Sequence, residues 1–274
     1  MRRIICMALL CCLLALPVCA AGEESYLALT FDDGPSGRFT SRLLDGLAER
    51  EVRATFFLCG YRVEQYPELT ARIAREGHEI GTHGYAHKFF SALSAKDVCC
   101  DLERAQRCIE DAGGGQPTLL RPPGGIFDAK VLRQSVCADL PVILWSVDPE
   151  DWRRSDSGAV AADIIREAKN GDVILLHDMS DSSVDAALRV IDELTAQGFR
   201  FVTVSELAAL SGTQLQGGQV YHRFSFAKND SISGREAETE PCTKPGFPPP
   251  LPRSVSFIAR QSPRRSPSRA PMAY

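Results

Sequence analysis

Residues Leu27–Ser36, LALTFDDGPS, place two adjacent carboxylates directly after an apolar run and before a Gly-Pro pair. The apolar run predicts a buried β-strand that ends near Asp32. One acidic side chain is enough to close an ordinary turn, because a single short acceptor can bond the turn's backbone. The second carboxylate, Asp33, therefore indicates a task other than turn formation.

Similar apolar runs recur along the chain and alternate with helical patterns. The predicted strands cover residues 26–31, 54–59, 79–82, 118–121, 141–147, 172–176 and 200–204. The predicted helices cover residues 40–50, 67–76, 94–112, 129–138, 157–169 and 183–197. Strands separated by helices predict an α/β fold with a parallel sheet, either open and doubly wound or closed into a barrel. Hydrophobic periodicity does not choose between these two arrangements.

The two ends of the chain differ in composition from this middle part. Residues 1–21 combine a basic start, an apolar run too short to span a membrane and small residues at their end, the pattern of a secretory signal peptide. We therefore expect an exported protein, secreted or on the cell surface, without a stable membrane span. Residues 228–274 are polar and rich in proline, which is typical of a disordered tail, either inert or weakly attracted to an anionic cell wall.

Length, charge and cysteines narrow the class of protein. Residues 22–212 suit one domain of the larger kind, followed by a short extension over residues 213–227 in which Gln219–Phe226 can form a further strand. A net charge of −4 argues against a nucleic-acid-binding surface.

Cys100 and Cys108 lie eight residues apart on one predicted helix, about 12 Å, which is too far for a disulfide. Other disulfide pairings remain open, but we expect Cys59 and Cys108 to be small buried apolar side chains.

Polar side chains with catalytic potential follow the predicted strands. They are Asp32 and Asp33, His83 and His87, Arg121, Asp151, and His177. In a closed α/β barrel the loops at the carboxyl ends of the strands share one face, so these side chains would converge. Two histidines four residues apart are often structural, but with one carboxylate they form a three-ligand set with an open position, the arrangement of catalytic zinc.

In this order the motifs TFDDGP, HxxxH, RPP, DW and LLH resemble those of the polysaccharide deacetylases, the NodB-homology family, carbohydrate esterase family four. The resemblance covers about residues 26–210. It implies a distorted (β/α) barrel of about seven parallel strands. It also implies a metal-dependent hydrolase that removes acetyl groups from N-acetylated sugars, such as those of peptidoglycan or chitin-like oligomers. We expect a monomer whose partner is this polysaccharide.

The resemblance also implies a role for each site residue. Asp33, His83 and His87 would bind a divalent metal, most often Zn²⁺, with Co²⁺ or Ni²⁺ as alternatives. Asp32 would be the general base and His177 the general acid. The base would be held by Arg121, and the acid would be oriented by Asp151. The substrate pocket would include Gly124, Trp145, Trp152 and Leu175.

Two glycines depart from the family pattern. Gly84 stands where the family usually has Ser or Thr. We therefore expect backbone hydrogen bonds alone to hold the loop that begins at His83 and carries His87, here called the metal loop. Gly124 replaces an aromatic wall of the sugar groove, although its N–H can still serve an oxyanion.

Two alternative functions stay open. They are removal of O-acetyl groups from a xylan-type polysaccharide, and sugar binding by a barrel with a structural ion. Acetate release from chitooligosaccharide and acetylated xylan separates them. A serine esterase is disfavoured because the chain has no GxSxG motif.

Overall fold

The computed structural model describes residues 24–226. The predicted signal peptide and the proline-rich tail lie outside these residues. Within the described part, no helix combines the length and apolar character that a membrane crossing requires.

The elements alternate between strands and helices, as the sequence predicts. The strands are β1 (Ser25–Asp32), β2 (Thr55–Leu58), β3 (Glu79–Thr82), β4 (Val142–Ile143), β5 (Val173–His177), β6 (Phe199–Val202) and β7 (Val220–Tyr221). The α-helices are α1 (Gly37–Glu49), α2 (Gly60–Gln65), α3 (Pro67–Arg75), α4 (Ala95–Asp111), α5 (Ala129–Cys137), α6 (Ser157–Glu167), α7 (Asp181–Ala196) and α8 (Val204–Leu210). Short 3₁₀ turns are η1 (Phe90–Ala92), η2 (Pro123–Gly125) and η3 (Asp151–Arg153). The sequence analysis missed α2 and α8, because six or seven residues are too few to show helical periodicity.

The main sheet is parallel and centred on β1. Its order is β3-β2-β1-β5, β6 also pairs with β1, and β4 pairs with β7 in a second, two-stranded parallel sheet. Single parallel bridges join Leu120 to Thr82 and Val142, and Val147 to Ile174. Regular pairing therefore leaves the barrel open between β3 and β5, and isolated bridges span that side. The predicted α/β class and the distorted, barrel-like arrangement of parallel strands are confirmed.

Two of the predicted strands are shorter than expected. Of residues 118–121, only Leu120 forms a bridge, because the following Pro122 and Pro123 have no N–H to continue the pairing. Of residues 141–147, only β4 is regular. A partner for β4 comes from β7, within the stretch Gln219–Phe226 that the sequence analysis proposed as an additional strand.

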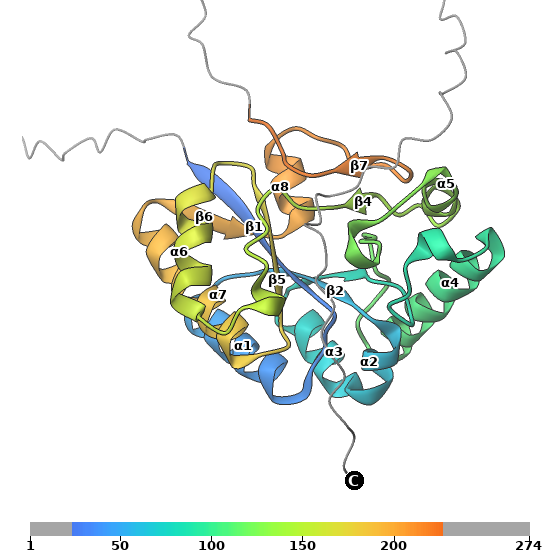
Figure 1. Cartoon of the computed structure of the whole chain (residues 1–274), viewed down its shortest axis with the longest axis horizontal. Helices are drawn as coiled ribbons and strands as arrows, with labels where there is room; N and C mark the ends of the chain where they lie inside the picture. Colours follow the sequence, from blue (N-terminus) through green and yellow to red (C-terminus); the bar gives the residue numbers. More distant parts are fainter. Residues whose placement is uncertain (1–23, 227–274) are drawn as a thin grey trace, which may run out of the picture.

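Both faces of β1 are buried, which explains its nearly continuous apolar sequence. Leu27, Leu29 and Phe31 pack in one cluster with side chains of α1 and α7, whereas Ala28 packs in a second cluster on the other face. Figure 1 shows β4 and β7 together on the side of the molecule away from α1 and α3. The strand ends are thus held by packing on both sides of the sheet.

The cysteines of the described part are all free thiols. Cys59 is buried, as the sequence analysis expected. Cys108 packs against the core but is only half-buried and lies beside Glu64, so the expectation that it is buried is wrong.

Candidate active site

Asp33, His83 and His87 converge at the carboxyl ends of β1 and β3, where the sequence places them. We call these three residues the metal cluster. One ligand atom from each of them lies within 4.8 Å of the ligand atoms of the other two. Asp33 Oδ1 is 3.0 Å from His87 Nε2 and 3.5 Å from His83 Nε2. The register of the strands brings these residues together, because Asp32 of β1 pairs with Phe57 of β2, and Phe57 pairs with Gly81 of β3.

The metal cluster fits a divalent ion. Asp33 Oδ1 is buried and accepts no hydrogen bond from any described group. His83 Nδ1 lies 2.6 Å from the Arg121 carbonyl oxygen, which accepts only if Nδ1 carries the proton, so the lone pair of Nε2 faces the cluster. Two imidazole nitrogens and one carboxylate oxygen are ligands that zinc and similar ions prefer.

The charges of the metal cluster agree with this fit. Burial raises the pKa of Asp33, but the neighbouring His87 and His83 outweigh it and hold the pKa well below its usual range. Burial lowers the pKa of His83, which favours the neutral imidazole that binds a metal. The close approach of the Asp33 carboxylate, 3.0 Å from His87 Nε2, raises the pKa of His87.

A carboxylate from α4 holds the loop that carries the two histidines. Asp101 accepts hydrogen bonds from the N–H groups of Tyr85 (2.6 Å) and Ala86 (3.3 Å). Gly84 has φ 76°, and a Cβ atom there would lie 2.6 Å from Asp101 Oδ1 and 2.8 Å from the Phe90 ring. The expectation that backbone bonds alone hold this loop is therefore wrong. Gly84 leaves the space that Asp101 and Phe90 fill.

Asp32 and Arg121 form a buried ion pair beside the metal cluster. Arg121 Nη1 donates to Asp32 Oδ1 at 2.7 Å and to the hydroxyl of Thr30 at 2.8 Å. Its other nitrogens donate to the carbonyls of Ile143 and Leu144, both at 3.0 Å. Burial lowers the pKa of Arg121, and the charge of Asp32 opposes that effect. Asp32 Oδ2 is left near the cluster, 3.8 Å from His83 Nε2.

His177 and Asp151 form a second pair on the other side of Asp32. His177 ends β5 and pairs in register with Asp32 of β1. The Asp151 carboxylate accepts from His177 Nδ1 at 2.8 Å and from the His177 backbone N–H at 2.9 Å. Burial by itself lowers the pKa of His177, but Asp151, together with smaller contributions from Asp32 and Asp33, outweighs burial and raises the pKa to about 9.

The predicted pocket residues differ in exposure. Leu175 is buried in β5, Trp145 is half-buried, and Trp152 is 66% exposed beside Asp151. Trp145 lies 5.6 Å from the Arg121 guanidinium, measured from its ring centre. Gly124 follows Arg121 and the two prolines with φ 66°. The structure thus places all four near the carboxyl ends of the strands, and their contacts with substrate stay a prediction.

The sequence analysis missed two residues of this face. Asp101 looks like any exposed helical acid in the sequence, and its contact with residues 85 and 86 is tertiary. Phe89, two residues after His87, is 47% exposed and packs over Gly124. The only signal in the sequence is the pair of phenylalanines that follows the HxxxH motif after one lysine.

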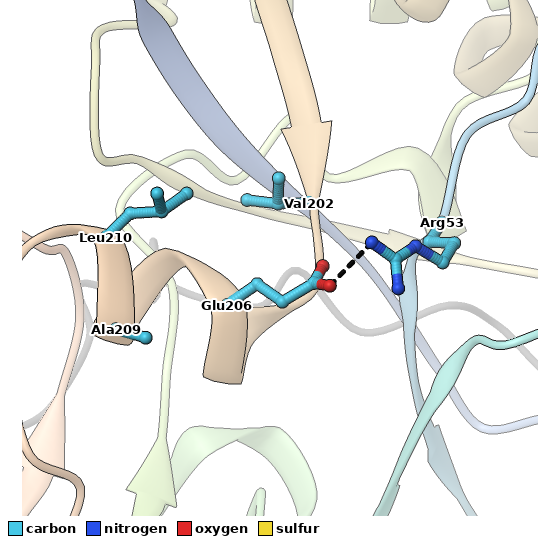
Figure 2. A pocket seen from close by; sticks show the side chains of 5 residues that line it. All are labelled: Arg53, Val202, Glu206, Ala209 and Leu210. Carbon is cyan, nitrogen blue, oxygen red and sulfur yellow. Dashed lines mark ion pairs between the residues drawn. The ribbon is translucent and has the colours of Figure 1, made fainter.

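A surface cavity of about 420 Å³ lies at the opposite end of the sheet from Asp32. It is lined by Arg53, Val202, Glu206, Ala209 and Leu210. Figure 2 shows Arg53 and Glu206 facing each other across it, with 2.6 Å between Nη2 and Oε1. Arg53 precedes β2, whereas Asp32 pairs with Phe57 near the other end of that strand. The cavity is therefore separate from the metal cluster.

Comparison with known proteins gives one consistent family. The family model described as polysaccharide deacetylase matches residues 20–143. The chain is 42% identical over 186 residues to the peptidoglycan-N-acetylmuramic acid deacetylase PdaC of Bacillus subtilis, covering 68% of this chain and 39% of PdaC. It is 38% identical over 190 residues to a peptidoglycan-N-acetylglucosamine deacetylase of Bacillus cereus, covering 68% of this chain and 89% of that protein.

The solved structures agree with the sequence comparison. A structure described as T48 deacetylase with substrate superposes with a TM-score of 0.69 at 38% identity, covering 72% of this chain and 96% of that one. The chain spans about two fifths of the length of PdaC, but nearly the whole of the Bacillus cereus protein. On these matches the chain belongs to the polysaccharide deacetylase family.

Proposed function

We propose that the protein is a metal-dependent N-deacetylase of N-acetylglucosamine-type residues in peptidoglycan or chitin-like oligomers. The observation that carries the proposal is the metal cluster flanked by the Asp32–Arg121 and Asp151–His177 pairs. Relatives named as peptidoglycan deacetylases support the substrate class. A base and an acid on either side of an ion suit hydrolysis of an amide better than sugar binding alone.

Asp32 is the group that takes up a proton in the proposed reaction. The metal cluster would hold a divalent ion such as zinc, which would supply Lewis acidity for the acetyl oxygen and for water. Arg121 fixes Asp32 through Oδ1, so Oδ2 accepts the proton of the water that attacks the acetyl carbon. Since Arg121 is fully buried and makes four hydrogen bonds, it holds the carboxylate in one orientation.

His177 is the group that returns a proton. Asp151 binds Nδ1–H, so the proton on Nε2 is the one available for donation. As the C–N bond breaks, the sugar nitrogen takes this proton, because an amine leaves poorly as an anion. A pKa of about 9 keeps His177 protonated at neutral pH, and the products are acetate and a free amino sugar.

The proposal includes export of the protein. Residues 1–21 carry the pattern of a signal peptide, and polymeric cell-wall substrates lie outside the cytoplasm. A fusion of these residues to a reporter enzyme should direct the reporter out of the cell. Retention of the reporter inside would contradict export.

Acetate release tests the proposed reaction directly. Zinc-loaded protein should release acetate from chitopentaose and from peptidoglycan faster than from acetylated xylan, and zinc-loaded Asp32→Asn should be the inactive control. Release from xylan alone would show that the enzyme is an O-acetyl esterase. Chitopentaose binding without acetate release would support a sugar-binding barrel instead.

A further inference from the structure

Two aromatic rings cover the two glycines that follow Arg121-Pro-Pro. A Cβ atom on Gly124 would lie 2.8 Å from Cε1 of Phe89, and one on Gly125 would lie 2.7 Å from Cη2 of Trp145. Both glycines have positive φ, 66° and 67°. Phe89 and Trp145 therefore occupy space that side chains at these two positions would need.

Phe89 sits on a part of the metal loop that is well anchored. It lies two residues after His87, and its carbonyl accepts the N–H of Ala92 to close the η1 turn. The next residue, Phe90, is fully buried and packs beside Gly84. The backbone that carries the Phe89 ring is thus held in place. The ring lies against Gly124, and nearly half of the residue's surface is exposed to solvent.

An exposed apolar side chain is not by itself a binding site, because single ones are common on protein surfaces. The position of Phe89 is what distinguishes it. Its loop supplies His83 and His87, and the loop it packs against follows Arg121, whose carbonyl accepts from His83. Phe89 therefore lies on the face of the molecule that carries the metal cluster, between two loops that contribute to the site.

We propose that Phe89 is a wall of the substrate groove, in the space that Gly124 leaves open, and that it contacts the apolar face of a sugar ring. This inference rests on the proposed function. His177 is the last residue of β5, whereas Phe89 follows β3, on the far side of β1 and β2 in the sheet order. The ring that contacts Phe89 is therefore a neighbour of the sugar that His177 protonates, and Phe89 sets a preference for oligomers.

The test compares Phe89→Ala with Leu210→Ala, a matched control. Leu210 is also 47% exposed but lines the cavity of Figure 2, away from the metal cluster. Phe89→Ala should raise the KM for chitopentaose about tenfold, because covering half a phenyl ring contributes an amount of this order. Its loss of kcat/KM on 4-nitrophenyl acetate should be much smaller. Phe89→Tyr should restore the chitopentaose KM, and Leu210→Ala should match the wild type.

Two results would overturn the inference. Equal losses on chitopentaose and 4-nitrophenyl acetate, accompanied by loss of bound zinc, would show that Phe89 acts only by positioning the metal loop. An unchanged chitopentaose KM would show that the ring does not contact the oligomer.

A binding measurement separates this inference from the proposed function. Chitopentaose affinity is measured by calorimetry in zinc-loaded Asp32→Asn, with and without Phe89→Ala. If the wild type releases no acetate, the proposed function fails, but a tenfold rise in Kd still supports a sugar contact at Phe89. An unchanged Kd contradicts that contact whether or not the enzyme is active.

Discussion

Replacing Asp151 with asparagine tests the acid assignment through the pH dependence of the rate. Burial lowers the pKa of His177, and the Asp151 carboxylate, through its 2.8 Å hydrogen bond and its charge, makes the largest contribution that raises it, ahead of Asp32 and Asp33. Asparagine keeps the size of the side chain and removes the charge. The pKa of His177 should then fall from about 9 to its ordinary 6.5 or lower.

The expected loss follows from the protonated fraction of His177. A fall from about 9 to 6.5 corresponds to roughly 3 kcal/mol, at about 1.4 kcal/mol per pH unit. At pH 8 the protonated fraction drops from about 0.9 to about 0.03, and at pH 6 only from about 1.0 to about 0.8. The variant should therefore lose about twentyfold more activity at pH 8 than at pH 6.

The assay is kcat for acetate release from chitopentaose by zinc-loaded wild type and Asp151→Asn between pH 6 and pH 10. Zinc per chain is measured at each pH, so that loss of the ion is not mistaken for loss of the acid. Equal losses at pH 6 and pH 8 would refute the reasoning, because a role in positioning alone does not depend on the protonation of His177.

Three further predictions test other contacts of the site. Asp101→Asn should weaken zinc binding about tenfold, measured by competition with a chelating dye, because the loop from Gly84 loses its charged acceptor; unchanged affinity would contradict this role. Arg121→Leu should lower the free energy of unfolding in urea by about 3–5 kcal/mol, since it leaves Asp32 buried without its partner, and a change below about 1 kcal/mol would argue against that. The pair of His177 with Asp151 should stabilise the fold fully below pH 6.5 and be lost as the pH rises through about 9, so the wild type should lose more stability over this range than His177→Gln; parallel stability curves would exclude such a contribution.

The positions at which three strands end were predictable from the sequence, because the buried parts of these strands are apolar and their ends are polar. β1, β3 and β5 are runs buried by the fold, so the charged or histidine residues at or directly after their ends mark the carboxyl edge of the sheet. Parallel register then brings Asp32 level with His177 without further information. This explains why the convergence of these side chains followed from the sequence order, whereas the ligand set of the metal cluster and the partners in the two flanking pairs came from the resemblance to the family.

The supporting contacts were not predictable in this way. Asp101 reaches the metal loop from α4, and Phe89 meets Gly124 across 35 residues of sequence, so neither contact has a local pattern. The sequence shows only that Gly84 and Gly124 lack side chains. Which neighbour fills each space depends on how α4 and η1 pack, and only the three-dimensional structure shows that.

The two carboxylates of TFDDGP provide the most direct test of the mechanism, because the mechanism assigns metal binding to Asp33 and proton transfer to Asp32. Asp33 Oδ1 faces two imidazole nitrogens, whereas Asp32 Oδ1 is bound by Arg121. The measurement is zinc per chain after dialysis, together with acetate release from chitopentaose, for Asp33→Asn and Asp32→Asn. The mechanism predicts that Asp33→Asn loses zinc and regains part of its activity when zinc is added.

For Asp32→Asn the mechanism predicts zinc close to the wild-type amount and a rate lower by about 10² to 10⁴, with no recovery on adding zinc. An empty site in Asp32→Asn with a loaded but inactive Asp33→Asn would reverse the two roles. If both variants stayed loaded with zinc and active, the paired carboxylates would serve only the turn, and the mechanism would be wrong.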